Sequence, residues 1–208
     1  MQAIPISCYI SDILRYYFQG RQIMILSAAE AMAKLKEGNE FYVAHGRANL
    51  DISPELRKST LSGQKPFAII VGCSDSRAIP ECIFNAALGE LFVIRIAGNV
   101  IDDHQLVSIE YATEHLVVKL IVVLGHDRCG AVDAAMNHDP DGYIKYITDE
   151  ISAAIGDEKD EVEACKLNAL ESVRIIESNL DIQRFEHDNG LMVKAALYHL
   201  ESGVVEFL

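Results

Sequence analysis

The chain has 208 residues, half of them hydrophobic, and a formal net charge of −13 at pH 7. The length fits one domain with a substantial core, and no uninterrupted apolar run approaches the roughly 20 residues that span a bilayer. The negative charge excludes nucleic acid and anionic membranes from the expected partners.

Residues 1–26 are expected to form an N-terminal extension. They include apolar residues such as Ile10, Leu14 and Phe18, which have no obvious target in their own subunit. We expect a helical arm that lies across a neighbouring copy of the chain. The segment lacks the basic start, clean apolar stretch and small-residue cleavage site of a signal peptide.

The first predicted helix follows this extension. Ser27 and Glu30 have the spacing of a capping box, with the serine as N-cap and the glutamate three residues later. The helix is expected to run to about Tyr42 on an amphipathic pattern. Residues 50–62 read as a polar connection with a helical turn after Ser53.

Strands and helices alternate through the rest of the chain. Short β-rich runs at residues 67–72 and 120–125 are each bounded by glycine, which is typical of strands buried on both faces. The further predicted elements are a strand at 90–95, helices at 105–118, 130–136, 142–154 and 161–176, and a terminal strand hairpin at 191–200 and 204–208. The alternation predicts an α/β fold with a mostly parallel central sheet flanked by helices, a C-terminal strand hairpin and the N-terminal helical arm.

Two short motifs directly follow the two buried strands. Cys73 comes after the first strand, His126 after the second, and Cys129 lies three residues beyond His126, near a helix start. Ligands collect at the carboxyl ends of strands in open α/β sheets, so the three side chains are expected to meet at one metal ion. Structural zinc sites close with four protein ligands and catalytic ones keep a position open. Asp75 is the ambiguous fourth candidate.

The cysteine count supports metal binding rather than disulfides. Five cysteines form no dense or even framework, which fits a reducing compartment, and we expect a cytoplasmic protein. Cys8, Cys82 and Cys165 have no ligand-like neighbours and are read as small buried hydrophobes.

Residues 73–77 (CSDSR) together with 125–130 (GHDRCG) resemble the zinc signature of the β-class carbonic anhydrases. The resemblance extends over most of the chain and includes residues 95–99. It implies an enzyme that interconverts carbon dioxide and bicarbonate with one Zn²⁺ per subunit, in homodimers that can pair into tetramers. Residues 27–208 would then form a single zinc-binding α/β catalytic domain.

Asp75 and Arg77 are the expected catalytic residues. Reversible hydration of carbon dioxide by a zinc-bound hydroxide requires zinc to lower the pKa of water toward 7. An ionised Asp75 can accept the hydrogen bond of that hydroxide, and Arg77 can hold the carboxylate through a two-point contact. The alternative is that Asp75 caps a helix and Arg77 forms a surface ion pair. We expect an open site, with Asp75 on Arg77 rather than on zinc.

Three further residues are assigned from the resemblance. Gln64 occupies the position of a glutamine that binds substrate in similar plant-type enzymes, and Phe92 and Tyr111 match aromatic residues of the family's pocket. An apolar wall suits carbon dioxide. Simple core packing is the competing interpretation for both aromatic residues.

Two other functions remain open from the sequence. The same zinc site can serve hydrolysis of carbonyl sulfide or carbon disulfide, because the difference would lie in the shape of the substrate channel. A non-catalytic, zinc-stabilised scaffold is the third hypothesis. A purely structural site needs neither the Asp75–Arg77 pair nor Gln64, so we rank the scaffold last.

Overall fold

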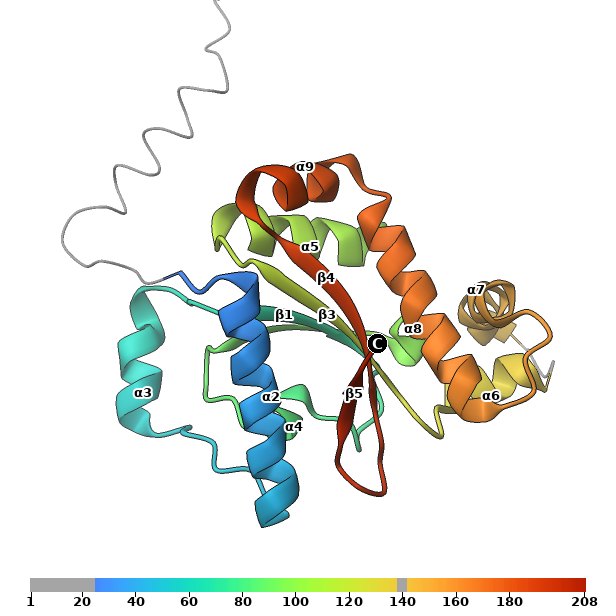
Figure 1. Ribbon diagram of the computed structural model, residues 1–208, viewed down its shortest axis with the longest axis horizontal. Coiled ribbons are helices and arrows are strands. Elements are labelled where there is room, and N and C mark those ends of the chain that lie inside the picture. Colours follow the sequence, from blue (N-terminus) through green and yellow to red (C-terminus); the bar gives the residue numbers. More distant parts are fainter. Residues whose placement is uncertain (1–24, 138–141) are drawn as a thin grey trace, which may run out of the picture.

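The computed structural model describes residues 25–137 and 142–208, which form a five-stranded sheet in the order β2-β1-β3-β4-β5 (Figure 1). The strands are β1 (Ala68–Gly72), β2 (Leu91–Arg95), β3 (Leu120–His126), β4 (Met192–Tyr198) and β5 (Val205–Phe207). Strands β2, β1, β3 and β4 are parallel, and β5 pairs antiparallel with β4. The predicted α/β fold, mostly parallel sheet and C-terminal hairpin are confirmed. The predicted N-terminal helical arm lies outside the described residues.

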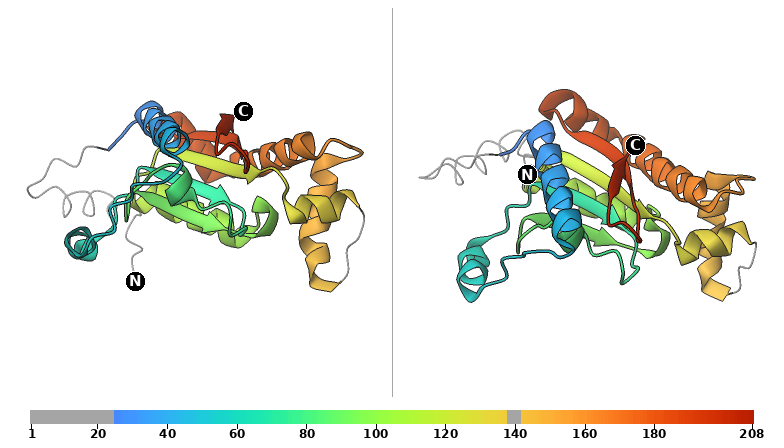
Figure 2. Two further views of the ribbon diagram at one scale, coloured as in Figure 1. Left: turned by 90° about the horizontal axis from the view of Figure 1, so that it is seen from below. Right: turned by 60° about the horizontal axis from the view of Figure 1, so that its bottom comes forward.

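Helices cover both faces of this sheet. They are α2 (Ala28–His45), α3 (Pro54–Ser59), α4 (Pro80–Ile83), α5 (Asp103–His115), α6 (Gly130–Met136), α7 (Lys145–Ile155), α8 (Glu161–Glu177) and α9 (Leu180–Asn189), with 3₁₀ turns at Thr60–Ser62, Ala97–Asn99 and Gly142–Ile144. In both views of Figure 2, α6 and α7 lie beyond the arrowheads of the strands, while α3 stands at the opposite end. None of the helices in the described residues is long and apolar enough to cross a membrane.

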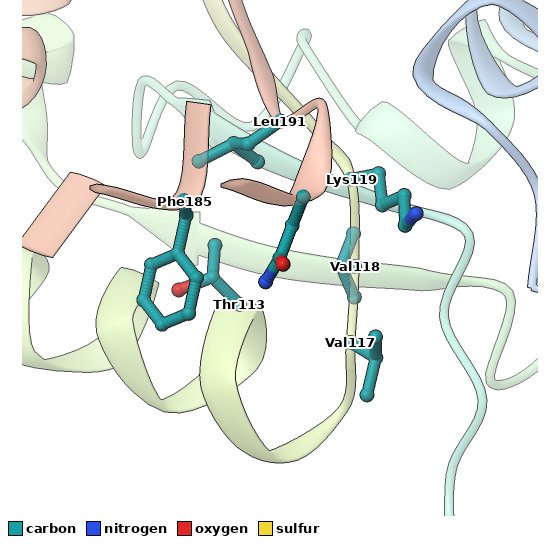
Figure 3. A pocket seen from close by; sticks show the side chains of 7 residues that line it. Thr113, Val117, Val118, Lys119, Phe185 and Leu191 are labelled. Atoms are coloured by element: carbon teal, nitrogen blue, oxygen red, sulfur yellow. The ribbon is translucent and has the colours of Figure 1, made fainter. Parts of the chain in front are cut away.

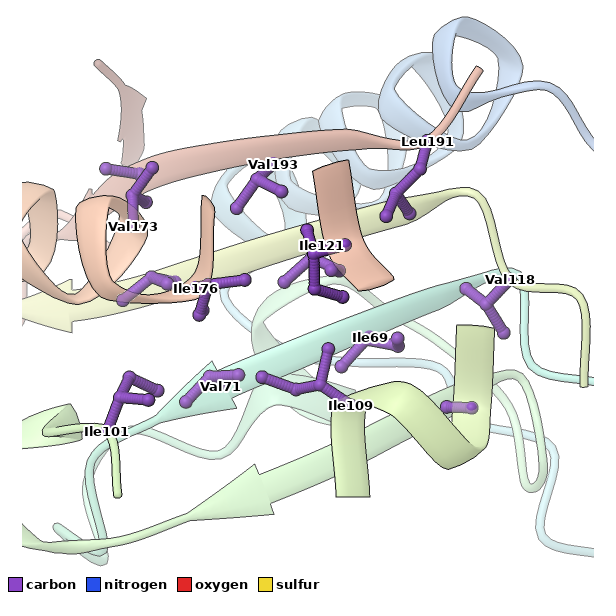
Figure 4. Packing of buried hydrophobic residues seen from close by; sticks show 14 of the residues in the cluster. Ile69, Val71, Ile101, Ile109, Val118, Ile121, Val173, Ile176, Leu191 and Val193 are labelled. Carbon is purple, nitrogen blue, oxygen red and sulfur yellow. The ribbon is translucent and has the colours of Figure 1, made fainter. Parts of the chain in front are cut away.

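The core divides into two layers because side chains alternate along each strand. Ile69 and Ile121 point toward the layer that contains residues of α5, α8 and α9, such as Ile109 and Ile176 (Figure 4). Ile70 and its alternate neighbours pack instead with α2 and α4. Every residue of β1 and β3 is buried. Burial of each such isoleucine contributes about 1.5–3 kcal/mol to the stability of the fold. The two central strands therefore hold the loops at their ends in fixed positions.

The predicted capping box at the start of α2 is present. The backbone N–H of Glu30 donates to the Ser27 hydroxyl over 3.3 Å, and the Ser27 N–H donates to the Glu30 carboxylate over 2.8 Å. The helix continues to His45, three residues past the expected Tyr42, and ends where Gly46 adopts φ 59°. Glycine reaches this left-handed conformation without a steric penalty.

Several predicted boundaries were wrong. Helix α5 ends at His115 rather than 118, and Val117 just beyond it has φ 58°, which no helix accommodates. His126 is the last residue of β3 rather than the first beyond it. The helix expected at 142–154 is a 3₁₀ turn followed by α7. Helices α4 and α9 were not predicted at all.

A small pocket lies at the amino ends of β3 and β4 (Figure 3). Its lining includes Thr113 and Val117 near the end of α5, Phe185 of α9, and Leu191 before β4. The volume of about 10 Å³ holds about one water molecule. The pocket therefore has no room for a substrate, and it lies at the opposite end of the strands from the two sequence motifs.

Candidate metal centre

Cys73, His126 and Cys129 converge at the carboxyl end of the sheet. Cys73 directly follows β1, His126 ends the neighbouring strand β3, and Cys129 is the N-cap residue of α6. Their candidate ligand atoms all lie within 4.8 Å of one another. The three residues are 6%, 1% and 1% exposed. The two sequence motifs thus meet at the carboxyl ends of the strands, as predicted, and the three side chains form a cluster that is able to hold a metal ion.

The orientation of the His126 ring indicates what the cluster binds. Its Nδ1 lies 2.8 Å from the backbone oxygen of Asp127, and a carbonyl only accepts, so Nδ1 carries the proton. The Nε2 atom is then a bare acceptor, and it is buried with no hydrogen-bond partner among the described residues. An unpaired buried polar atom is costly. A metal ion at Nε2 would satisfy it, as the backbone contact at Nδ1 is the usual outer support of a metal-bound histidine.

The two thiols are electrostatically linked. Hydrogen bonding between them lowers the pKa of Cys73 and raises that of Cys129. The pair therefore favours one thiolate and one thiol, since two adjacent negative charges are unfavourable in a buried site. A divalent metal ion reverses that preference, because it binds thiolates and displaces the remaining proton. Two thiolates and a neutral imidazole make a donor set that fits a borderline-soft ion.

Asp75 lies beside the cluster and is held by Arg77. Asp75 Oδ1 accepts from the backbone N–H and the Nε of Arg77 over 2.8 and 2.9 Å, and Oδ2 accepts from Nη2 over 2.7 Å. The guanidinium lowers the pKa of Asp75 to about 2, so the carboxylate is ionised at neutral pH. Asp75 Oδ2 lies 3.9 Å from His126 Nε2. Asp75 does not cap a helix here, because α4 begins only at Pro80.

Arg95 supports the same loop and was missed as a site residue. Arg95 ends β2 and pairs in register with Gly72 at the end of β1. Its Nε donates to the backbone oxygen of Cys73 over 2.9 Å, and its Nη2 donates to that of Asp75. The available signal in the sequence was an arginine at the end of a predicted strand. This signal points to Cys73 only once it is known that β2 lies next to β1 in the sheet.

The expected substrate residues lie elsewhere in the chain. Phe92 pairs with Ile69, four residues before Cys73, which corresponds to about 13 Å along the strand. Tyr111 of α5 lies against Phe92, with ring centroids 6.2 Å apart. Gln64 is exposed in the loop before β1. The structure brings the two aromatic residues together, but it does not bring them to the Cys–His–Cys cluster of the same chain.

Comparisons with known proteins agree with this arrangement. A family model described as carbonic anhydrase matches residues 68–205. Carbonic anhydrase 2 of Mycobacterium tuberculosis is 47% identical over 130 residues, which cover 60% of this chain and 63% of that protein. A carbonic anhydrase of Emericella nidulans is 32% identical over 190 residues, with 84% and 82% covered.

Solved structures give the same result for the fold. A β-carbonic anhydrase from Sordaria macrospora, described as tetrameric, superposes with a TM-score of 0.70 at 25% identity over 85% of this chain and 95% of that one. A β-carbonic anhydrase from Aspergillus fumigatus gives 0.69 at 27% identity, with 86% and 89% covered. This chain, with its Cys–His–Cys cluster at the carboxyl end of a parallel sheet, belongs to the β-class carbonic anhydrase family.

Proposed function

We propose that this chain is a zinc-dependent carbonic anhydrase, which catalyses the reversible hydration of carbon dioxide to bicarbonate. The observation that carries the proposal is the buried Cys73–His126–Cys129 cluster with an ionised Asp75 beside it. Membership of the carbonic anhydrase family supports the reaction. The match spans less than two thirds of the mycobacterial relative, so the activity rests on the site as well as on the relatives.

Cys73, His126 and Cys129 would hold one Zn²⁺ per subunit. Two thiolates and one imidazole suit zinc, and three protein ligands leave a fourth position for water. Zinc supplies the acidity that makes water a nucleophile near neutral pH. The remaining chemistry belongs to the chain's own residues, which must orient the nucleophile and admit carbon dioxide.

Asp75 and Arg77 are the proposed catalytic pair. Both Asp75 oxygens already accept from Arg77, which restrains the carboxylate from turning toward the metal ligands. Oδ1 accepts two hydrogen bonds, but Oδ2 accepts only one and so retains acceptor capacity, since a carboxylate has about four lone-pair positions over its two oxygens. We therefore infer that Asp75 Oδ2 accepts a hydrogen bond from the nucleophilic water and so directs the lone pair of the water oxygen toward carbon dioxide. Arg77 keeps Asp75 ionised throughout the cycle.

Gln64, Phe92 and Tyr111 are proposed to contribute to substrate binding across a subunit contact. Phe92 lies about 13 Å along the strand from the cluster of its own chain, Tyr111 packs against Phe92, and Gln64 precedes β1. We therefore infer that another copy of the chain presents these residues to its own metal centre. Tyr111 is 46% exposed and Val107, one turn earlier on α5, is 63% exposed. We therefore propose a homodimer, which can pair into a dimer of dimers. Sedimentation that gives only a 23 kDa species would contradict it.

The compartment is proposed to be the cytoplasm. The four cysteines among the described residues are free, and the two proposed ligands must stay reduced to bind zinc. A reducing compartment meets this requirement. Cell fractionation that recovers the protein only with an oxidising compartment would contradict this placement.

The metal assignment is tested by elemental analysis of purified full-length protein. Wild type should contain about one zinc per chain, and Cys73→Ser, His126→Ala and Cys129→Ser should each lose it. Cys82→Ser is the matched control, because this cysteine lies away from the cluster and should leave the zinc content unchanged. Wild-type zinc in all three ligand variants would overturn the assignment. Parallel assays with carbon dioxide and carbonyl sulfide on the same preparation establish which substrate is hydrated or hydrolysed.

A further inference from the structure

The Ala97–Asn99 turn contacts one of the proposed metal ligands. The backbone N–H of Gly98 donates to Cys73 Sγ over 3.3 Å, and both groups are buried. The turn follows β2 directly, and its start is aligned by two backbone hydrogen bonds between Ile96 and the β1 end, at Gly72 and Ser74. A peptide dipole therefore points at the sulfur from a fixed position.

Helix α8 also holds this turn, through two side-chain hydrogen bonds to its backbone. Asn168 Nδ2 donates to the backbone oxygen of Gly98 over 2.7 Å, and Ser172 Oγ donates to that of Asn99 over 2.9 Å. Asn168 is 3% and Ser172 2% exposed. Burying the amide of Asn168 costs more free energy than burying an apolar side chain of similar size. Its short hydrogen bond to Gly98, which contacts the ligand sulfur, therefore indicates a role beyond packing.

Close packing fixes where Gly98 can lie. Its φ is +69°, and a Cβ atom at this position would lie 2.7 Å from Ile151 Cδ1 and 3.2 Å from Ala131 Cβ. Helices α7 and α6, which carry these residues, thus pack closely against the turn. The Gly98 N–H has little freedom to leave the sulfur while Asn168 holds the carbonyl of the same residue.

We propose that Asn168 is a positioning residue that holds Gly98 so that its N–H withdraws charge from the Cys73 sulfur. The inference rests on the proposed metal site at Cys73, His126 and Cys129. Two thiolates donate more negative charge to a metal than neutral imidazoles do, and this excess opposes the acidity that hydration requires. A hydrogen bond to a ligand atom from outside the coordination shell is an established way to tune a metal site.

The hydrogen bond itself is testable in the wild-type chain. Full-length protein is loaded with a spin-active cadmium isotope and studied by NMR. A scalar coupling between the cadmium nucleus and the Gly98 amide proton is expected, because the Cys73 sulfur connects the two through the hydrogen bond. A spectrum in which Gly98 is assigned and uncoupled, while the Cys73 methylene protons are coupled, would overturn the proposal.

The positioning role is tested with cobalt-substituted protein. In Asn168→Leu, the sulfur-to-cobalt charge-transfer band should shift to longer wavelength, because a sulfur that loses its hydrogen bond holds its electrons less tightly. Thr113→Val is the matched control: it removes a buried hydroxyl that bonds only within α5, so it should lower stability without moving the band. Asn168→Ser, with a smaller change in volume, replaces the leucine variant if that fails to fold.

The outcomes separate this inference from the proposed function. Wild-type protein that takes up cobalt without a sulfur charge-transfer band would overturn the metal site on which the inference rests. A normal band that stays at the same wavelength in the Asn168 variant would overturn the inference alone. None of these measurements depends on enzymatic activity.

Discussion

Asp75 and Arg77, two residues apart in the loop after β1, form a two-point ion pair whose carboxylate lies 3.9 Å from the unpaired His126 Nε2. The same arginine donates to the backbone oxygen of Arg128 over 3.0 Å. Arg77 thus links the two loops that carry the proposed ligands. Its position makes Asp75 either a partner of the nucleophile or, if released, a competitor for the metal.

Replacing Arg77 should release Asp75. In Arg77→Ala, carbon dioxide hydration is expected to fall about 10–100-fold, as is typical for outer-shell residues of metal sites, while zinc remains bound. Stopped-flow assays and elemental analysis on the same samples provide the measurement. Arg184→Ala removes an exposed ion pair with Asp181 on α9 and serves as control. Full activity in Arg77→Ala would rule out the proposed role of the pair.

The Asp75–Arg77 pair should also appear in the acid stability of the metal-free protein. Arg77 lowers the pKa of Asp75 from its usual 3.8 to about 2. The folded state therefore gains stability from the ionised carboxylate above pH 3.8, and this gain disappears as the pH falls from about 4 to about 2. The difference in unfolding free energy between wild type and Asp75→Asn, measured in urea, should shrink across this window. A difference that is constant from about pH 6 to about pH 2 would contradict it.

Arg95 should matter for metal affinity rather than for chemistry. Arg95→Gln loses the donors to the backbone oxygens of Cys73 and Asp75, and so loosens the loop that carries one ligand. Zinc affinity measured by competition with a chelator is expected to fall about 10-fold. Arg184→Gln is the control of the same chemistry on an exposed helix. Equal affinities in both variants would show that the Arg95 contacts do not support the site.

Val117 offers a prediction about stability alone. A β-branched residue at φ 58° is strained, so Val117→Gly is expected to raise the unfolding free energy by about 0.5–1 kcal/mol. Ala33→Gly places glycine inside α2, at an exposed position, and should cost about 1 kcal/mol. Denaturant titration of both variants gives the comparison. A loss of stability in Val117→Gly would mean that packing around its side chain outweighs the backbone strain.

The sequence was sufficient to predict the proposed metal ligands, but not the residues whose hydrogen bonds hold the loops around them. Two strand-end motifs were sufficient to place Cys73, His126 and Cys129 together, since parallel strands end at one edge. The contacts of Arg95 and Asn168 could not be predicted, because they depend on strand order and on the packing of α8 against a turn 70 residues earlier in the chain. Helix α4 is a single short turn, which is too short for a hydrophobic periodicity in the sequence to indicate a helix.

The substrate residues show a different limit of the sequence. Phe92 and Tyr111 are predicted from the family resemblance, by their position relative to the two motifs, and their proximity to each other agrees with one shared surface. Which metal centre that surface faces depends on a second copy of the chain. No periodicity within one sequence carries this information.

Stopped-flow hydration of carbon dioxide by full-length protein is the most direct test of the central claim. One preparation is assayed as isolated with its zinc content verified, again after the zinc is removed by a chelator, and again after zinc is restored. We predict that the hydration activity disappears when the zinc is removed and returns in proportion to the zinc restored. The Cys129→Ser variant should not regain activity when zinc is added. Protein with a full complement of zinc that hydrates carbon dioxide no faster than buffer would contradict the account.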